Sequence, residues 1–518
     1  MAEDFDVIIV GSGAGGGTLA HTLAPTGKRI LILERGSFLP GELAKSSGAT
    51  DAGVNVDAGP AGAVETWYDS HQRPFPAPAH YCVGGATKLY GAALCRLRPA
   101  DFGRVAHLDG ESPAWPIGYA GFEPWYAKAE WLYQVHGLHG EDPTEGAWSA
   151  EYLWPPVTRE PVIAQLAHEL TRAGYQPFHT PTGVLSHEPA DADIIAVRPL
   201  LGMLNVTLLT DAEVTCLRTD ARGQSVTAVV VNRGGRQEVY RGGIVVLAAG
   251  AVNSARILLR SASDAHPGGL ANGSGQVGRN LMCHNRVDVT AAVREPHNAG
   301  FPQALGVNDF YLGGRRDKWP LGSIALLGDR RKAARGPARV PASREPAGTD
   351  DARAIAFRLT TEDLPRPANR VTVDGQGRVG LAHVPTGDGA ARLLFRSLRA
   401  MLSGTKLIAH EILDWTGAIR SSDFGGTCRF GADPATSVLD VDCRAHELDN
   451  LYVVDSGFFP SIGAVSPALT VMANAIRVGE HLAARLGCRP AARDATPWKQ
   501  LRPRMARPGS TPGLAVSC

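Results

Sequence analysis

The chain has 518 residues, of which 44% are hydrophobic and 20% are charged, and its formal net charge is +1. These values are typical of a globular protein with a sizeable core, and the length favours more than one domain. The near-neutral charge gives no reason to expect a nucleic acid or a membrane surface as a partner. No apolar stretch is long enough to span a bilayer.

The N-terminus is acidic and leads directly into a predicted strand, so no secretory signal is visible and we expect a cytoplasmic protein. The eight cysteines are scattered, with no CxxC pair and no His/Cys cluster at zinc spacing. We therefore expect buried, reduced thiols and no metal site.

A dinucleotide-binding motif stands at the start of the chain. The apolar run 7–10 predicts a strand that breaks into Gly11, Gly13 and Gly16, and a helix is expected over about 18–23. Gly11 allows the tight turn, Gly13 lets the backbone approach a pyrophosphate, and Gly16 lets the helix pack closely on the sheet. A second apolar run, 30–33, ends in Glu34, whose carboxylate would accept hydrogen bonds from ribose hydroxyls.

The next elements alternate between loops, helices and strands. Hydrophobic spacing predicts helices over 123–136, 166–173 and 253–261. Alternating residues predict strands over 206–209 and 226–231 that flank a polar turn at 220–223, and the apolar run 244–249 predicts a strand of a parallel sheet. Loop is expected over 37–62, and a second Gly-rich element covers 80–91.

The second half of the chain favours antiparallel β structure over 287–327 and 354–373. Between these segments, residues 329–351 are rich in Arg, Ala, Pro and Gly, a composition that buries little apolar surface. An active-site lid and a surface insertion are equally good interpretations of this segment. The tail, 491–518, has the same character and is expected to be disordered.

Several spaced motifs resemble the glucose-methanol-choline (GMC) family of flavin oxidoreductases. They comprise the N-terminal Gly motif, the second Gly pair at 84–85, and the segments 249–254, 277–280, 426–431, 450–455 and 466–473, and they span nearly the whole chain. The resemblance implies FAD rather than NAD as the cofactor. It also implies an α/β fold in which a Rossmann-like FAD-binding domain is interleaved with an α+β substrate domain built on an antiparallel sheet.

The resemblance further implies the domain boundaries and the residues near FAD. The FAD domain would comprise 1–100, 195–290 and 425–490, and the substrate domain 101–194 and 291–424. No His lies at 86–91, where some members attach FAD, so non-covalent FAD is expected. The cofactor-binding residues implied in this way are Gly11, Gly13, Ala14, Gly16, Glu34, Arg35, Gly84, Gly85, Thr87, Tyr90, Gly91, Val214, Ala249, Gly250, Asp455, Ser456, Pro467 and Ala468.

The chain departs from the family at the catalytic positions. The family oxidises alcohols with a His base three residues before a Gly-Thr pair and an Asn or His partner before the Pro of the last motif. Here Asp423 occupies the first position and Ser466 the second. A carboxylate has an ordinary pKa near 3.9 and is a weak base unless burial raises that value.

Three interpretations of this departure remain open. Asp423 could act as the base, or hold a cationic substrate while water acts as the base. Glu362 or His410 could supply the base instead. The protein could also perform other chemistry, as a lyase, a decarboxylase or a flavin-binding protein without alcohol oxidation, because fold does not determine reaction type.

The remaining expectations concern the substrate and two other histidines. Some family members act on aminosugar hydroxyls in antibiotic pathways, and an acidic residue at 423 would suit a substrate with ammonium groups. We therefore expect a polar, sugar-like alcohol, an aminoglycoside being one form, with oxygen or another molecule as electron acceptor. His284 could line a domain boundary or serve in packing, and His80 could lie near the flavin or on the surface.

Overall fold

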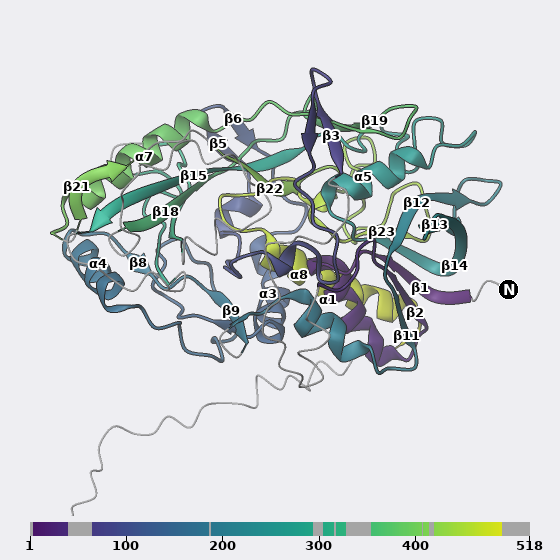
Figure 1. Cartoon of the computed structure of the whole chain (residues 1–518), viewed down its shortest axis with the longest axis horizontal. Helices are drawn as coiled ribbons and strands as arrows, with labels where there is room; N and C mark the ends of the chain where they lie inside the picture. Colours follow the sequence, from purple (N-terminus) through teal and green to yellow (C-terminus); the bar gives the residue numbers. More distant parts are fainter. Residues whose placement is uncertain are drawn as a thin grey trace, which may run out of the picture.

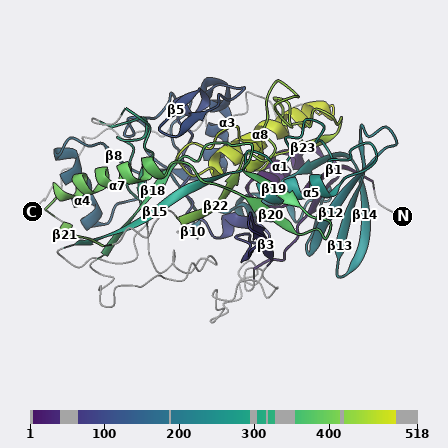
Figure 2. The same ribbon diagram turned by 90° about the horizontal axis from the view of Figure 1, so that it is seen from above.

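A computed structural model describes residues 4–39, 65–185, 188–293, 304–314, 318–327, 354–406, 408–413 and 419–488. The expected lid (329–351) and tail (491–518) lie outside these residues, as does most of the expected loop 37–62. Two seven-stranded sheets form the framework and lie towards opposite ends of the long axis (Figure 2). Helices α1, α8 and α3 lie between them (Figure 1).

The first sheet is built on parallel strands, as its apolar runs predict. The strand order is β11-β2-β1-β14-β13-β12, and β23 also pairs with β14. β11, β2, β1, β14 and β23 run parallel, whereas β12, β13 and the first half of β14 form antiparallel ladders. The bounds are β1 Asp4–Val10, β2 Ile30–Leu33, β11 Val206–Leu209, β12 Ala212–Thr219, β13 Val226–Arg233, β14 Arg236–Leu247 and β23 Leu451–Val453.

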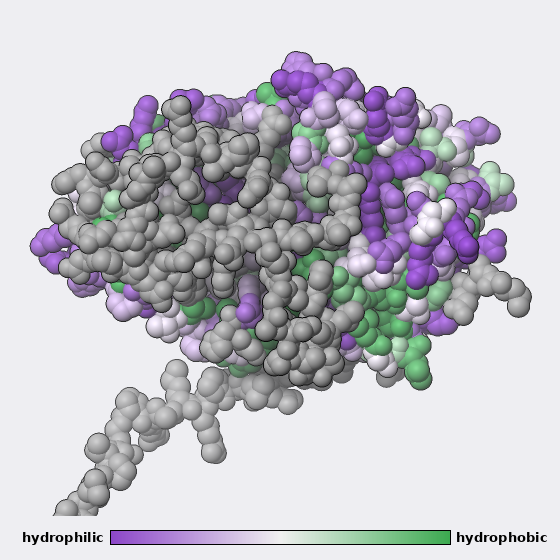
Figure 3. Space-filling view, in the orientation of Figure 1, coloured by the Kyte–Doolittle hydropathy of each residue, from purple (hydrophilic) through white to green (hydrophobic). Residues whose placement is uncertain are grey.

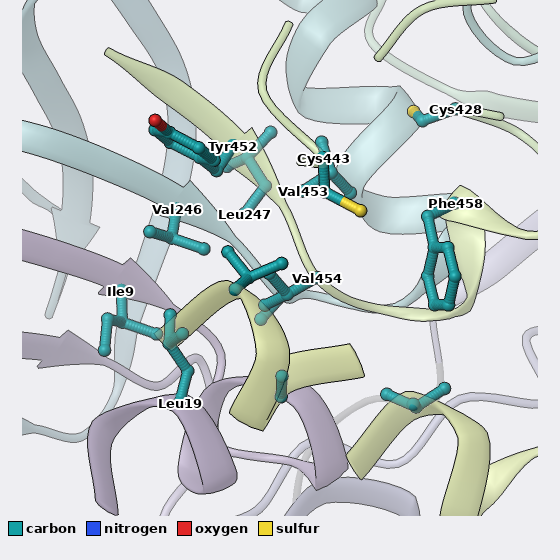
Figure 4. Packing of buried hydrophobic residues seen from close by; sticks show 14 of the residues in the cluster. Ile9, Leu19, Val246, Leu247, Cys428, Cys443, Tyr452, Val453, Val454 and Phe458 are labelled. Atoms are coloured by element: carbon teal, nitrogen blue, oxygen red, sulfur yellow. The ribbon is translucent and has the colours of Figure 1, made fainter. Parts of the chain in front are cut away.

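Hydrophobic packing fastens the helices to this sheet. Ile9 and Val246 face Leu19 of α1, and Val454 lies beside them in the same cluster (Figure 4). α1 packs on α8, α8 packs on α3, and α5 packs against β12 and β19. The helices are α1 Ala14–Leu23, α3 Tyr119–Leu132, α5 Ala251–Arg260 and α8 Ala468–Arg485, and β19 is Arg370–Val373.

The second sheet is antiparallel throughout. Its order is β21-β15-β18-β17-β16-β8, and β22 also pairs with β15. Apolar side chains of α4 and α7 share a buried cluster with those of β15 and β18. The bounds are β8 Pro177–Phe178, β15 Met282–Val293, β16 Gly306–Val307, β17 Ser323–Leu326, β18 Ala354–Thr361, β21 Ile408–Leu413, β22 Ile419–Gly425, α4 Pro161–Arg172 and α7 Asp388–Ser403.

Shorter elements complete the described fold. Three small sheets are β19-β20-β3-β4, β10-β9-β7 and β5-β6. Their strands are β3 Thr66–Asp69, β4 Pro74–Pro76, β5 Val105–His107, β6 Gly110–Ser112, β7 Val135–His136, β9 Thr182–Leu185, β10 Glu188–Pro189 and β20 Val379–Ala382. The single-turn helices are η1 Ala24–Thr26, η2 Gly85–Lys88, η3 Pro99–Phe102, η4 Asp193–Val197, η5 Arg198–Leu200 and η7 Ser456–Phe458.

Several predicted elements need correction. α1 begins at Ala14 rather than near 18, because the glycines of the motif already form its first turn. The helix expected over 123–136 begins at Tyr119 and ends at Leu132, so that residues 135–136 form a strand. The helix expected over 166–173 begins at Pro161, where proline suits a first helical position.

Other elements were not predicted or were paired wrongly. The turn at 220–223 joins β12 to β13, so the partner of β13 is a strand that was not predicted rather than the predicted strand 206–209. α7 was not predicted. β19, expected in the large antiparallel segment, pairs with β20 in a separate small sheet because residues 362–369 leave the ladder. The domain boundaries stay a prediction.

On the face shown in Figure 3, polar residues cover the upper right and hydrophobic residues gather at the lower right. Figure 1 places α1 and β11 in the latter region. No helix in the described ranges is long and apolar enough to cross a membrane.

Candidate active site

One large cavity of about 520 Å³ extends between the two sheets. It begins where β1, β2 and β14 of the first sheet end, at Val10, Leu33 and Ala248. It ends against Arg286, Ser323 and Arg358 of the second sheet. A cavity of this size falls in the range of small-molecule and cofactor sites.

Three helices begin at the wall of this cavity. Residues from the N-terminal ends of α1, α5 and α8 line it, with Gly13, Gly250 and Pro467 as the N-cap residues. The first turn of a helix has backbone N–H groups without intrahelical partners and carries the positive end of the helix dipole. Three such ends around one cavity favour an anion such as the pyrophosphate of a dinucleotide.

The glycines of the first motif serve different contacts. A Cβ at Gly16 would lie 1.9 Å from the carbonyl oxygen of Gly11, and one at Gly15 would lie 2.4 Å from that of Val454. Both glycines therefore allow α1 to lie in contact with neighbouring backbone, at Gly11 and at Val454. A Cβ at Gly13 would meet nothing closer than the oxygen of Gly84, at 3.7 Å. Gly13 thus faces the cavity. The motif did not predict the requirement at Gly15, because it depends on β23 and the segment that follows it.

The second Gly pair forms a turn that docks on the first motif. Gly84 and Gly85 have φ values of +88° and +56°, in the left-handed region that favours glycine. The Gly84 N–H donates to the Ser12 hydroxyl at 3.1 Å. Thr87 donates to the Gly84 carbonyl at 2.6 Å and accepts from the Ala192 N–H at 2.9 Å. The two turns are therefore held as one surface.

Glu34 is buried and accepts hydrogen bonds from the first turn. Its carboxylate accepts from the N–H and the hydroxyl of Ser12, at 3.0 and 2.6 Å, and from the N–H of Gly36 at 2.9 Å. Burial raises the pKa of Glu34, and these hydrogen bonds oppose the rise. The carboxylate thus stands at the end of β2, where the motif predicted it.

A charged cluster surrounds the same end of the cavity. The Arg35 guanidinium lies 4.0 Å from the ring centre of Tyr81 and 3.0 Å from Glu65. Arg256 pairs with Glu65 at 2.9 Å and with Glu213, the neighbour of Val214, at 3.3 Å. The buried Oδ1 of Asn253, at the start of α5, has no hydrogen-bond partner. A ribose or adenine donor would satisfy it, so this end of the cavity fits a nucleotide.

Asp455 connects α5 to η7. Its carboxylate accepts from the N–H groups of Gly250 and Gly457 at 3.1 and 2.8 Å, and from the Ser254 hydroxyl. Burial raises the pKa of Asp455 to about 6, against these hydrogen bonds.

Nearly all the predicted cofactor residues line the cavity together. Gly16 and Gly84 do not line it, because they support the turns from behind. The lining set is Gly11, Gly13, Ala14, Glu34, Arg35, Gly85, Thr87, Tyr90, Gly91, Val214, Ala249, Gly250, Asp455, Ser456, Pro467 and Ala468. Their individual roles stay a prediction.

Asp423 and Ser466 both line the cavity. Asp423 lies in β22, at a β-bulge in the pairing of this strand with β15. Phe424 pairs with Cys283 and residue 420 pairs with Asn285, so the three residues 421–423 lie opposite the single residue His284. Bulges of this kind re-aim side chains and are frequent beside active sites. The Asp423 carboxylate accepts a hydrogen bond from Arg286, and its Oδ2 lies 3.7 Å from Nδ1 of His284.

This environment keeps Asp423 ionised. Burial by itself would raise its pKa, but Arg286, His284 and Arg358 outweigh that effect and hold the pKa well below the ordinary value. A carboxylate of this kind retains a proton poorly. Its charge is also already balanced by Arg286, which weakens the interpretation that Asp423 anchors an ammonium group.

Glu362 does not lie in the large cavity. It lines a separate, smaller cavity with Asp101 and His107. Its carboxylate lies 3.2 Å from Nε2 of His107 and accepts from the Gly463 N–H at 3.2 Å. Glu362 as the base is thus not supported, because these contacts turn it away from the space that Asp423 faces.

The other histidines are placed as follows. His410 belongs to β21, whose side chains lie outside the described residues. His80 lines the large cavity, and burial lowers its pKa. His284 is buried beside Asp423, and sequence spacing could not have revealed this contact.

Buried polar atoms without partners mark the substrate end. They are Oδ1 of Asn308, Oγ1 of Thr180 and Nε of Arg286, all on residues that line the cavity. Such atoms are costly unless a ligand or water pairs with them, so this wall suits a molecule rich in hydroxyl groups. Among the residues that the structure describes, no group of His, Cys, Asp and Glu could hold a metal ion.

Gly13→Val tests the cofactor end of the cavity. The valine side chain would project between the two Gly turns, where the pyrophosphate would bind, and we expect a folded protein without bound flavin. Flavin absorbance and circular dichroism measure the two properties. Gly202→Val, at an exposed glycine with open space around its Cβ position, is the control and should retain flavin. A yellow Gly13→Val protein would contradict the assignment.

Comparisons with known protein families match three segments. A model described as an FAD binding domain matches residues 6–81. Two models described as GMC oxidoreductase match residues 165–286 and 402–475.

Known relatives extend over almost the whole chain. Paromamine 6'-oxidase from Streptomyces fradiae is 30% identical, covering 94% of this chain and 93% of its own length. 6'''-Hydroxyparomomycin C oxidase from Streptomyces lividus is 29% identical over the same shares. The crystal structure of pyridoxine 4-oxidase from Mesorbium loti superimposes with a TM-score of 0.66 at 19% identity, covering 92% of this chain and 99% of that one. This last likeness concerns the fold alone.

Proposed function

Because the chain belongs to the GMC oxidoreductase family and is an FAD-dependent alcohol oxidoreductase, we propose that it oxidises a hydroxyl group of an aminosugar. The relatives named for paromamine and 6'''-hydroxyparomomycin C support this substrate class. The observation that carries the proposal is one continuous cavity, which joins the Gly turns and helix N-termini to Asp423 and Ser466.

The residues at the cofactor end fit FAD. The N-termini of α1, α5 and α8 would hold the pyrophosphate, and Glu34 and Asn253 would hold the ribose and adenine portion. FAD supplies the acceptor for the hydride of the substrate carbon when it is bound. Non-covalent binding is part of the proposal, since residues 86–91 contain no His.

At the substrate end, Asp423 would accept the hydrogen bond of the reacting hydroxyl. Arg286 holds this carboxylate in place. Asn308, Thr180 and the Nε of Arg286 would pair with other substrate oxygens, which fixes the carbon that reacts. Ser466, which precedes α8 and lines the same cavity, would also contact the substrate.

An anaerobic titration tests the proposed function. The purified protein should be yellow, with about one FAD per chain released by acid denaturation, and paromamine should bleach the flavin band. A neutral disaccharide without amino groups is the matched control and should react much more slowly. Mixing the reduced protein with oxygen then tests whether oxygen is the electron acceptor. If the flavin is reoxidised slowly by oxygen, other electron acceptors should be tested.

Two results would contradict the proposal. If flavin stays with the denatured protein, binding is covalent, and His80 becomes the first residue to change. If no amino or neutral sugar alcohol bleaches the flavin, the substrate class is wrong. Location in the cytoplasm remains a prediction from the sequence.

A further inference from the structure

His284 is an ionisable residue whose position the proposed function leaves unexplained. Its side chain is fully buried. Nε2 lies 3.2 and 3.1 Å from the carbonyl oxygens of Ile462 and Gly463, which can only accept hydrogen bonds, so Nε2 carries a hydrogen. The other nitrogen, Nδ1, is buried without a hydrogen-bond partner and lies 3.7 Å from Oδ2 of Asp423.

In the neutral imidazole the lone pair of Nδ1 is directed at Asp423, whereas the imidazolium donates to Asp423 and lowers the pKa of that carboxyl group. Two lone pairs that face each other across 3.7 Å repel, and a proton between them would turn the contact into a hydrogen bond. Hydrogen bonds of catalytic groups are often long before substrate binds and tighten in the complex. The unpartnered Nδ1 is therefore positioned to accept a proton from Asp423.

We propose that His284 receives the proton of the substrate hydroxyl through the Asp423 carboxyl group. The inference rests on the proposed function, because it assumes that an alcohol reacts beside Asp423. His284 acts through Asp423 and is a positioning residue rather than a catalytic one. The proton would thus come to rest on a histidine of β15, which reaches the substrate through Asp423.

The step balances as follows. The O–H bond of the alcohol breaks and its proton passes to Asp423, which transfers a proton to Nδ1 of His284. The C–H bond would break as a hydride with both electrons leaves the carbon, for which bound FAD would supply the acceptor, and the carbon–oxygen double bond would form. The result is an imidazolium beside a carboxylate, an arrangement stabilised by charge at short range. The ordinary pKa of an imidazole is about two units higher than that of a carboxylic acid, so the transfer from Asp423 to an imidazole is favourable.

The charged groups around His284 come from several elements. Asp423 of β22, Arg286 of β15 and Arg358 of β18 act on the Nδ1 side. Two carboxylates lie near Gly463, on the Nε2 side of His284. Glu362 accepts a hydrogen bond from the Gly463 N–H, and Asp101 Oδ2 lies 3.1 Å from the position that a Cβ on Gly463 would occupy. Asp363 accepts from the N–H of Cys283, next to His284. Burial raises the pKa of Asp101 to about 7.

His284→Gln separates the proton role from a packing role. The glutamine amide can still donate to the carbonyls of Ile462 and Gly463, but it has no basic nitrogen near Asp423. We expect FAD binding to persist while flavin reduction at saturating paromamine slows at least about 10²-fold. The pH dependence of flavin reduction should also differ between the wild type and H284Q, because the variant lacks the basic nitrogen beside Asp423.

Nuclear magnetic resonance of ¹⁵N-histidine-labelled protein supplies a readout without turnover. The signal that disappears in H284Q belongs to His284. Its chemical shifts should change in D423N, because the imidazole then no longer faces a carboxylate. These spectra test the inference even if no alcohol reduces the flavin, so its failure is distinct from failure of the proposed function.

The control is His383→Gln, because His383 is another histidine whose largely buried side chain lies close to an aspartate, 2.7 Å from Asp363. Its pH profile should match the wild type. The double variant D423N/H284Q should be no slower than D423N, since both changes interrupt one pathway. Multiplying effects in the double variant, an unchanged pH profile in H284Q, or a His284 signal that ignores D423N would each overturn the inference.

Discussion

Asp423→Asn is expected to slow flavin reduction by about 10²–10⁴-fold, the range typical of losing a general base. Asparagine has nearly the same shape and can still accept the hydrogen bond of Arg286, but it cannot take up a proton. FAD should remain bound, because Asp423 belongs to β22 of the second sheet, whereas Glu34 follows β2 of the first sheet. Stopped-flow reduction under anaerobic conditions measures the rate at saturation and the substrate dissociation constant separately.

The two constants distinguish the possible roles of Asp423. A base lost from the transition state lowers the rate at saturation, whereas a lost ammonium anchor mainly weakens binding. Asp288→Asn is a matched control, because Asp288 also pairs across strands with an arginine, Arg358, at 2.8 Å, yet does not line the cavity. If Asp423→Asn changes neither constant, Asp423 is not part of the site.

Gly16→Ala is expected to prevent formation of the native protein, a larger effect on structure than that of Gly13→Val. The added Cβ would lie 1.9 Å from the Gly11 carbonyl oxygen and 3.1 Å from the Ala248 Cβ, so α1 would have to move away from the sheet. Overpacking of a fitted core costs about 1–3 kcal/mol, and more where backbone itself must shift. That loss is a large part of the stability of a typical domain.

Soluble yield, circular dichroism and flavin content measure this outcome. Gly202→Ala is the matched control, because the same methyl group would meet nothing within 4 Å there. A soluble, yellow Gly16→Ala protein with native circular dichroism would show that α1 can shift without cost. That result would contradict the close packing of the first turn on β14.

The sequence alone determined the cofactor half of this protein. The strand, the glycines and Glu34 follow one another within one short segment, so local geometry places them together wherever the chain folds as β-turn-α-β. The parallel strands followed from continuous apolar runs such as 30–33, since burial on both faces excludes alternation. Asp423 and Ser466 were found by their positions in the family motifs, and both line the cavity.

Only the tertiary structure decided how Asp423 is charged and what stands behind it. Arg286 and His284 are far from Asp423 in sequence, and they reach it because β22 pairs with β15 through a bulge that no local pattern encodes. The same long-range packing turned Glu362 into the neighbouring cavity and made Gly15 a contact of Val454. Pairing register and helix packing depend on the whole chain, and they determined which ionisable groups meet beside the substrate.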